Sequence, residues 1–234
     1  MIRANCRSSF QPADLDFLAA SLPSLSNPSR FDSQMLDEML DCPEVFKALL
    51  ERHDCLEVSP HFYFYVLARH VLVEAGLKDR ELADYVASML TEFSQQRLLA
   101  RVESSGEEKF NYVFELLQAL QSASGPRVFF IRAHVGNASL FLTGIFPEHI
   151  AHRAERRGAP SLGYFENVGG ANYLTASEHQ LARELHLENV LGCLGERFQS
   201  VRHALNQLSD RLISIDPSSS GINSLLLKWD DSSA

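Results

Sequence analysis

Residues 127–147 read Arg127-Val-Phe-Phe-Ile-Arg-Ala-His134-Val-Gly-Asn-Ala-Ser-Leu-Phe-Leu-Thr-Gly-Ile-Phe-Pro147, the densest apolar run of the chain. Its first residues favour a strand by composition, but no partner strand is apparent nearby, so we expect a helix. The run is long enough to cross a membrane, yet Arg132, His134 and Asn137 inside it are costly in lipid. The sequence therefore predicts a core helix and no membrane span.

One stripe of that expected helix carries only small or polar side chains. A spacing of four, three and four residues places these side chains on one face. They are Arg132, Gly136, Ser139 and Thr143. Small residues on one face let a neighbouring helix approach closely, and the later glycines of Gly163-Tyr-Phe165 and Gly169-Gly-Ala-Asn-Tyr173 add to that expectation.

The rest of the chain predicts an all-α fold, a multi-helix globular bundle with a buried central helix and a long C-terminal helix. Ser59-Pro60 suits a helix start and Gly76 a helix stop, and the helix between them is apolar all round, as in a central helix. Residues 1–10 are expected to be a flexible arm, 11–215 a single helical domain, and 216–234 a Ser-rich tail with a short apolar patch at Leu225 to Trp229.

The C-terminal part of the domain carries a leucine seam with alternating spacings of four and three residues. The seam consists of Leu187, Leu191, Leu194, Phe198, Val201, Leu205, Leu208 and Leu212. Charges do not bracket it, so we interpret it first as packing within the bundle. A homodimer through the 187–212 helix is the second interpretation.

Composition excludes several classes of partner. The chain has 234 residues and a net charge of −9, which argues against general nucleic-acid binding and against docking on anionic membranes. Its four cysteines form no Cys-x-x-Cys pair, and its start lacks the apolar stretch of a signal peptide. A reducing cytoplasm is the simplest location.

Motifs of metal and cofactor chemistry are absent from the sequence. None of the nine histidines has a glutamate three residues before it, as di-iron bundles require, and no His-Glu-x-x-His occurs. Neither a Gly-x-Ser-x-Gly elbow, a phosphate loop nor a dinucleotide fingerprint is present. We expect no metal and no cofactor, while enzymatic activity stays open.

Two groups of residues are candidates for binding. His70, Arg132, His134 and Tyr173 are candidates for a ligand pocket between the 59–75 helix and the 127–173 stretch. His70 lies one helical turn from Glu74, an arrangement that orients an imidazole for acid–base work but more often only satisfies a core histidine.

The second group is the densest basic cluster of this acidic chain: His149, His152, Arg153, Arg156 and Arg157. The planar guanidinium group of arginine binds carboxylates and phosphates well, so the cluster indicates a small anionic ligand or an acidic protein partner. The equally weighted alternative is internal pairing with Glu148, Glu155 and Glu166.

The run Gly136-Asn-Ala-Ser-Leu-Phe-Leu-Thr-Gly-Ile-Phe-Pro-Glu148, with Gly163-Tyr-Phe165 and Gly169-Gly-Ala-Asn-Tyr173, resembles a group of uncharacterised bacterial all-helical proteins with no assigned activity. The resemblance extends from about Ser59 to Leu212 and implies a bacterial, cytoplasmic protein. It implies no chemistry.

The absence of catalytic motifs and the leucine seam favour a non-enzymatic helical domain that binds a partner protein or assembles a complex. The alternative is a helical small-ligand-binding protein or enzyme. An exposed apolar patch over a solid core would favour the first, and a closed pocket with converging polar side chains would favour the second.

Overall fold

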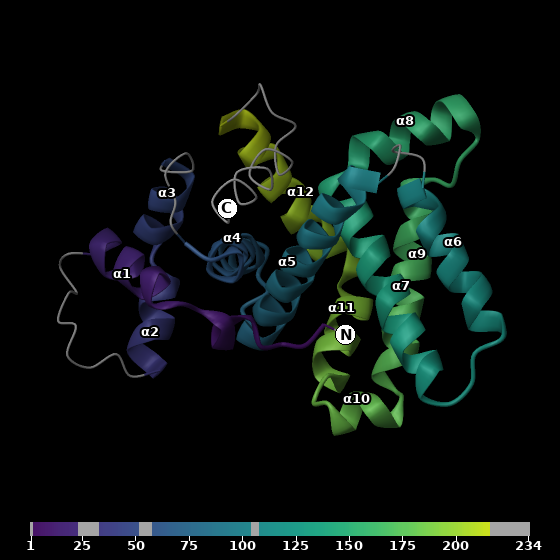
Figure 1. Cartoon of the computed structure of the whole chain (residues 1–234), viewed down its shortest axis with the longest axis horizontal. Coiled ribbons are helices and arrows are strands. Elements are labelled where there is room, and N and C mark those ends of the chain that lie inside the picture. The colour runs from purple at the N-terminus through teal and green to yellow at the C-terminus, as the bar shows by residue number, and fades with distance from the viewer. Residues whose placement is uncertain (1, 23–32, 52–57, 104–107, 216–234) are drawn as a thin grey trace.

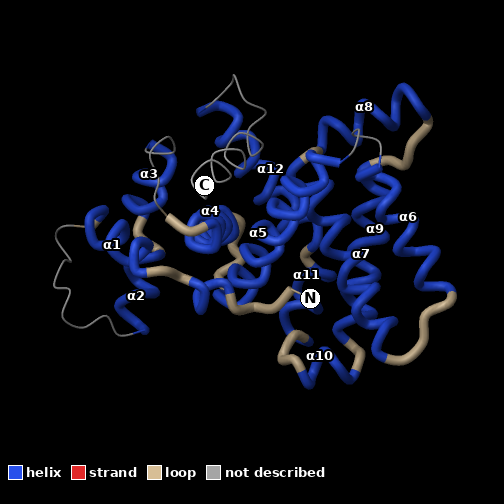
Figure 2. Tube along the Cα trace, in the orientation of Figure 1, coloured by secondary structure: helices blue, strands red, loops and turns tan. Residues whose placement is uncertain are grey.

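The described part of the computed structural model covers residues 2–22, 33–51, 58–103 and 108–215, and it contains helices but no strand (Figure 2). The expectation of an all-α bundle is therefore confirmed. The tail expected over residues 216–234 lies outside the described residues.

Among the described residues, the first half of the chain forms a short 3-10 helix and six α-helices: η1 Cys6–Ser9, α1 Pro12–Ser21, α2 Ser33–Leu40, α3 Pro43–Glu51, α4 Pro60–Glu74, α5 Arg80–Glu103 and α6 Glu108–Gln121. The second half forms six more: α7 Pro126–Ile145, α8 Pro147–Arg157, α9 Leu162–Ser177, α10 Gln180–Glu184, α11 Glu188–Glu196 and α12 Phe198–Ile215. Figure 1 shows α1 to α3 on one side of α4 and α5, and α6, α7 and α9 on the other.

The boundaries of the central helix α4 follow the local sequence signals. The Ser59 hydroxyl accepts a hydrogen bond from the Phe62 amide, and Pro60 occupies the first turn, where no amide donor is needed. At the other end Gly76 takes φ 80°, and the Leu77 amide donates to the Leu72 carbonyl at 2.8 Å. This is a Schellman cap. Its left-handed position favours glycine, because glycine has no Cβ to clash with the backbone.

The N-terminal residues differ from the flexible arm that the sequence predicts for residues 1–10. Ile2 and Cys6 are buried, and both carboxylate oxygens of the buried Asp84 accept from Arg7, at 2.9 Å from its amide and 2.8 Å from Nε. The same guanidinium reaches Asp37 at 2.7 Å. These ion pairs hold the segment against α2 and α5 because leaving the Asp84 carboxylate buried without a counter-charge would be costly.

Asp14 joins the starts of two helices. Its carboxylate is fully buried and accepts from the Gln11 amide at 2.7 Å, closing the first turn of α1. It also accepts from the amide and the hydroxyl of Ser59, at 2.6 and 2.7 Å. One carboxylate thus satisfies donors that would otherwise remain unpaired at the N-terminal ends of α1 and α4.

Helix α7 forms the core of the second half and packs against α6, α9 and α12. It is the one described helix that is long and apolar enough to span a membrane by length and composition, and most of it is buried inside the fold. Its C-terminal carbonyls are capped from α12: the Asn206 side-chain amide donates to Thr143 and Gly144 oxygens at 2.9 and 2.7 Å, and the Ser209 hydroxyl donates to Ile145 at 3.2 Å.

All eight side chains of the leucine seam are buried within the single chain, so its interpretation as bundle packing is confirmed. The helix itself is interrupted at Arg197, where φ is −107° and ψ is 20°, and the seam continues from α11 into α12 across this break. A homodimer through the same side chains would require them to leave this core.

Candidate functional site

Asn137 lies where α5, α7 and α9 meet. Its side-chain oxygen accepts hydrogen bonds from the hydroxyls of Tyr173 at 2.7 Å and Tyr85 at 3.0 Å. Burial raises the pKa of both tyrosines well above the ordinary value, so both hydroxyls stay protonated and act as donors. We call Tyr85, Asn137 and Tyr173 the Tyr85–Asn137–Tyr173 triad. Its side chains are neutral and buried, so their hydrogen bonds are suited to fixing the relative positions of α5, α7 and α9.

The small-residue stripe of α7 does bring a neighbouring helix close, as the sequence predicts. A Cβ at Gly136 would lie 2.6 Å from the ring of Tyr173, and one at Gly169 of α9 would lie 2.7 Å from Cβ of Ser139. Arg132 extends the same face, since its Nη1 donates to the Asn172 side-chain oxygen at 3.1 Å. Arg132, Gly136 and Ser139 of the stripe thus contact α9, whereas the Thr143 hydroxyl donates within α7, to the Ser139 carbonyl.

The four candidates for a ligand pocket do not share one set of neighbours. Arg132 meets α9 beside Tyr173, whereas the His134 ring faces Phe93 of α5 with centroids 5.6 Å apart. His70 stacks on Phe46 of α3 at 4.7 Å, away from the other three. The structure brings Arg132 and Tyr173 near each other and places the two histidines against other helices. Ligand binding by these residues stays a prediction.

Both candidate histidines are partly buried, and burial lowers the pKa of each. For His70 the charges of Asp41 and Glu74 oppose this shift without overcoming it. Glu74 is itself engaged elsewhere, because both its oxygens accept from the Arg211 guanidinium of α12, the shorter bond being 2.7 Å. The arrangement therefore favours neutral histidines with structural contacts over an acid–base pair.

In the part of the chain that the structure describes, no group of three or more His, Cys, Asp or Glu side chains could hold a metal ion. Cys6, Cys42 and Cys193 are free thiols there. Burial raises the pKa of each, most strongly for Cys6, which makes them poor nucleophiles near neutral pH.

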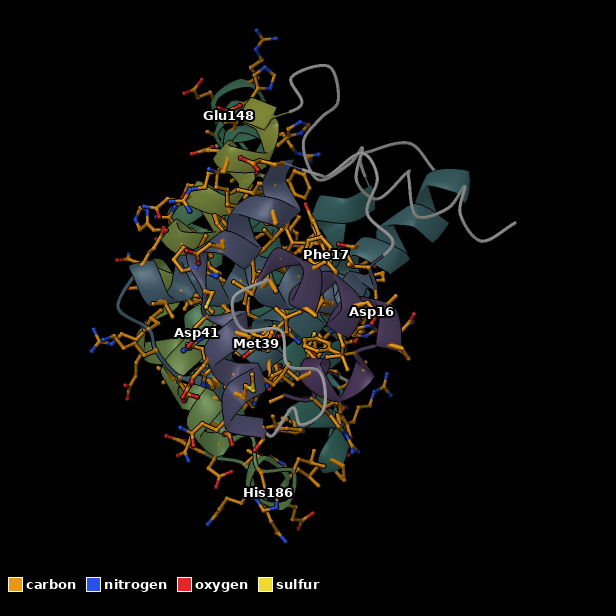
Figure 3. All side chains as sticks on the ribbon, turned by 90° about the vertical axis from the view of Figure 1, so that its left-hand side faces the viewer. Asp16, Phe17, Met39, Asp41, Glu148 and His186 are labelled. Atoms are coloured by element: carbon orange, nitrogen blue, oxygen red, sulfur yellow. The ribbon has the colours of Figure 1, made fainter. Side chains whose placement is uncertain are left out.

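The basic cluster lies on α8, at the end of the molecule opposite the α10–α11 turn. Figure 3 shows the two ends, marked by Glu148 and His186. His149, His152 and Arg156 are exposed, and Arg153 is half-buried. The side chain of Arg157 lies outside the described part of the structure. We call the four described residues the α8 basic face.

One of the internal partners considered for this cluster is engaged elsewhere. Glu166 of α9 pairs with Arg202 of α12, and its other oxygen accepts from Gln199 at 3.2 Å. Glu148 and Glu155 are exposed on α8 itself. Among the described residues no ion pair reaches Arg156.

Two exposed aromatic rings, one from α6 and one from α9, lie side by side. Phe114 of α6 and Tyr164 of α9 stack with centroids 5.9 Å apart, and they remain 38% and 36% exposed. We call them the aromatic pair. The sequence pattern does not reveal it, because Phe114 shares its helical spacing with Leu117 and Leu120, which are partly buried against the core. No other helix of the described chain covers these rings, and this follows from the tertiary structure and not from the sequence.

Comparisons with protein family models, with curated proteins and with solved structures found no match for this chain.

Proposed function

We propose that this chain is a non-enzymatic helical domain that binds a partner protein through the aromatic pair. The observation that carries the proposal is the exposure of two stacked rings on the outside of a well-packed core. Single exposed apolar residues are ordinary on protein surfaces, but adjacent large ones mark interaction sites. Tyrosine in particular is enriched at interfaces, because its ring supplies apolar area and its hydroxyl a polar contact.

The interior supports this choice over a ligand-binding role. The Tyr85–Asn137–Tyr173 triad satisfies its own hydroxyls, and His134 and His70 contact aromatic rings of different helices. A bacterial cytoplasmic setting is part of the proposal. It rests on the resemblance described above and on the free thiols of the described cysteines.

The proposal is tested by cross-linking in the native host, with tagged chain carrying either the natural sequence or Phe114→Ala with Tyr164→Ala. The matched control is Phe130→Ala. Phe130 is another exposed aromatic, 42% accessible, in the first turns of α7, whose other end leads into α8. We expect one partner to be enriched by the natural chain and by the control, cross-linked to α6 or α9, and lost with the double variant.

Circular dichroism of the purified variants checks that each is folded. A partner retained by a folded double variant, or no partner cross-linked to α6 or α9 in any sample, would show that the proposal is wrong.

A further inference from the structure

Helix α3 is a short outer element whose stability depends on its contact with α4. It packs against α1 and α4, on the side of α4 that faces away from α7 and α9 (Figure 1). With 9 residues it is shorter than the roughly 12–15 residues that an isolated helix needs in water. Val45 and Leu49 are buried, and the Phe46 ring stacks on the imidazole of His70 of α4 with centroids 4.7 Å apart. The imidazole is therefore part of the surface that holds α3.

One nitrogen of this imidazole makes no hydrogen bond. His70 is half-buried, but its Nε2 atom is buried and has no hydrogen-bond partner among the described residues. On a neutral ring this nitrogen can be the one that carries no proton. On an imidazolium both ring nitrogens are donors, so protonation would create a buried N–H without an acceptor, which is costly.

The two carboxylates that could stabilise such an imidazolium are already bound to arginines. Asp41 accepts hydrogen bonds from Arg69 at 2.8 Å and from Arg80 at 2.7 Å. Glu74, one turn after the histidine on α4, accepts with both oxygens from Arg211 of α12, the shorter bond being 2.7 Å. A protonated ring would therefore have to compete with a guanidinium for either carboxylate.

Protonation would also bring two positive charges together at one aromatic ring. The Arg211 guanidinium lies over Phe46, with its Cζ atom 5.7 Å from the ring centroid, and the charge of Arg69 disfavours a proton on His70. Asp37 of α2 is bound to Arg7. The other charged side chains of α2, α3 and the last turns of α12 are exposed: Glu38, Glu44, Lys47, Glu51 and Asp210.

The proton affinity of His70 changes when α3 leaves. Burial lowers the pKa of His70, and the charges of Asp41 and Glu74 and the Leu40 backbone oppose this shift without overcoming it. The pKa is thus lower while α3 is in place than in an opened, hydrated state, where it is about 6.5. A group whose pKa is lower in the closed state takes up a proton on opening, so acid favours the open state.

We infer that α3 is an acid-released cover on α4: protonation of His70 separates its ring from Phe46 and detaches α3, while the rest of the fold stays closed. The proton binds at Nε2, and the surface of α4 that α3 covers then becomes accessible. The aromatic pair has no part in this switch, because Phe114 and Tyr164 belong to α6 and α9, on the other side of α4 and α5 (Figure 1). The switch and the proposed function can therefore succeed or fail separately.

The test is hydrogen–deuterium exchange of the full chain at about pH 7.5 and about pH 5.5, with each rate corrected for the chemical exchange rate at that pH. We expect the protection factors of amides in residues 43–51 to be about three- to tenfold lower at the acidic pH, because each unit by which the pKa is lowered contributes at most tenfold. Protection of α7 and α9 should be the same at both pH values.

Variants of the chain assign the effect to one histidine. His70→Gln keeps a planar polar side chain that does not titrate, so the protection of residues 43–51 should no longer depend on pH. The matched control is His134→Gln on α7, which removes the other half-buried histidine with a lowered pKa and leaves α3 untouched. This control should keep the full pH dependence in residues 43–51.

A second measurement needs no variant. Nuclear magnetic resonance of the natural chain follows the His70 ring protons, and their titration midpoint should lie below about 6.5 and coincide with the midpoint of α3 opening. Unchanged protection of residues 43–51 at acidic pH, or a pH dependence that persists in His70→Gln, would overturn the switch. Simultaneous loss of protection in α3, α7 and α9 would overturn it too, because the whole fold would then open together.

Discussion

Gly136 and Tyr173 touch across the crossing of α7 and α9: a Cβ on Gly136 would lie 2.6 Å from Cδ1 of the tyrosine ring. The ring cannot move aside, because it is fully buried and its hydroxyl is bound to Asn137. The two helices therefore meet at a distance that only a glycine permits.

Gly136→Ala should consequently destabilise the fold by about 1–3 kcal/mol, the usual cost of forcing an extra carbon into a packed core. Gly192→Ala is the matched control within α11. A Cβ there would find only Ser177, 3.8 Å away, so alanine should stabilise the helix by about 0.5–1 kcal/mol. Urea unfolding measures both changes. Equal effects of the two substitutions would contradict the close contact.

Asn137→Leu should destabilise the protein by about 2–5 kcal/mol, because it leaves the buried hydroxyls of Tyr85 and Tyr173 without their acceptor. Adding Tyr85→Phe and Tyr173→Phe to this variant should recover part of the loss, since no donor then remains unpaired. A denaturant series over the single, double and triple variants checks the coupling. Strictly additive effects would mean that the three side chains do not act as a unit.

His186 is the one described non-glycine residue with a positive φ, 54°, and it occupies the left-handed position of a Schellman cap after α10. His186→Gly should stabilise the fold by about 1 kcal/mol, because glycine bears no Cβ penalty there. Gly76→Ala is the reverse control, at the same position of the cap after α4. Nothing lies within 4 Å of the new Cβ, so the backbone strain alone should lower the free energy of unfolding by about 1–2 kcal/mol. Thermal unfolding of both variants tests the pair.

Stability should depend on pH in two windows. His134 and His70 have pKa values lowered by burial, so their contribution is complete above about pH 6.5, the unfolded value, and is lost as the pH falls below it. Although burial alone would raise the pKa of Asp41, Arg69 and Arg80 outweigh it and hold that pKa below its usual range. Its contribution is therefore complete above about pH 4 and is lost as the pH falls further.

Urea unfolding between pH 7 and 3 distinguishes these windows. His134→Gln should reduce the change in the free energy of unfolding between about pH 7 and 5. Asp41→Asn should reduce that change only below about pH 4. If His134→Gln leaves the upper window unchanged, the burial of that imidazole does not control the pH dependence.

The helices that the sequence predicts well are those whose ends carry local signals. Ser59-Pro60 and Gly76 bound α4 because a cap depends on residues within one turn. The break at Arg197 has no such signal: the leucine seam keeps its period through it, and neither proline nor glycine occupies the position. The direction of a chain at such a point depends on tertiary packing.

The long-range ion pairs and hydrogen bonds of the first half could not be predicted for a similar reason. Arg7 binds Asp84 across 77 residues and Asp14 binds Ser59 across 45, so no local spacing connects them. The exposure of Phe114 cannot be predicted from the sequence either. A periodic pattern identifies an apolar face of a helix but does not show whether another helix covers that face. The basic cluster was visible from composition alone, whereas its display on one side of α8 depends on the burial of Ile150.

The cap that α12 places on α7 has a consequence for the order in which the protein can be completed. The last carbonyls of α7 receive their donors from Asn206 and Ser209, which follow more than 60 residues later in the chain. At a synthesis rate of about 5–20 residues per second, roughly 3–12 s pass between the synthesis of the end of α7 and the synthesis of those two donor residues. During that interval the last carbonyls of α7, the one described helix long and apolar enough to span a membrane, have no donors from α12, and this is when a nascent chain would depend on a chaperone.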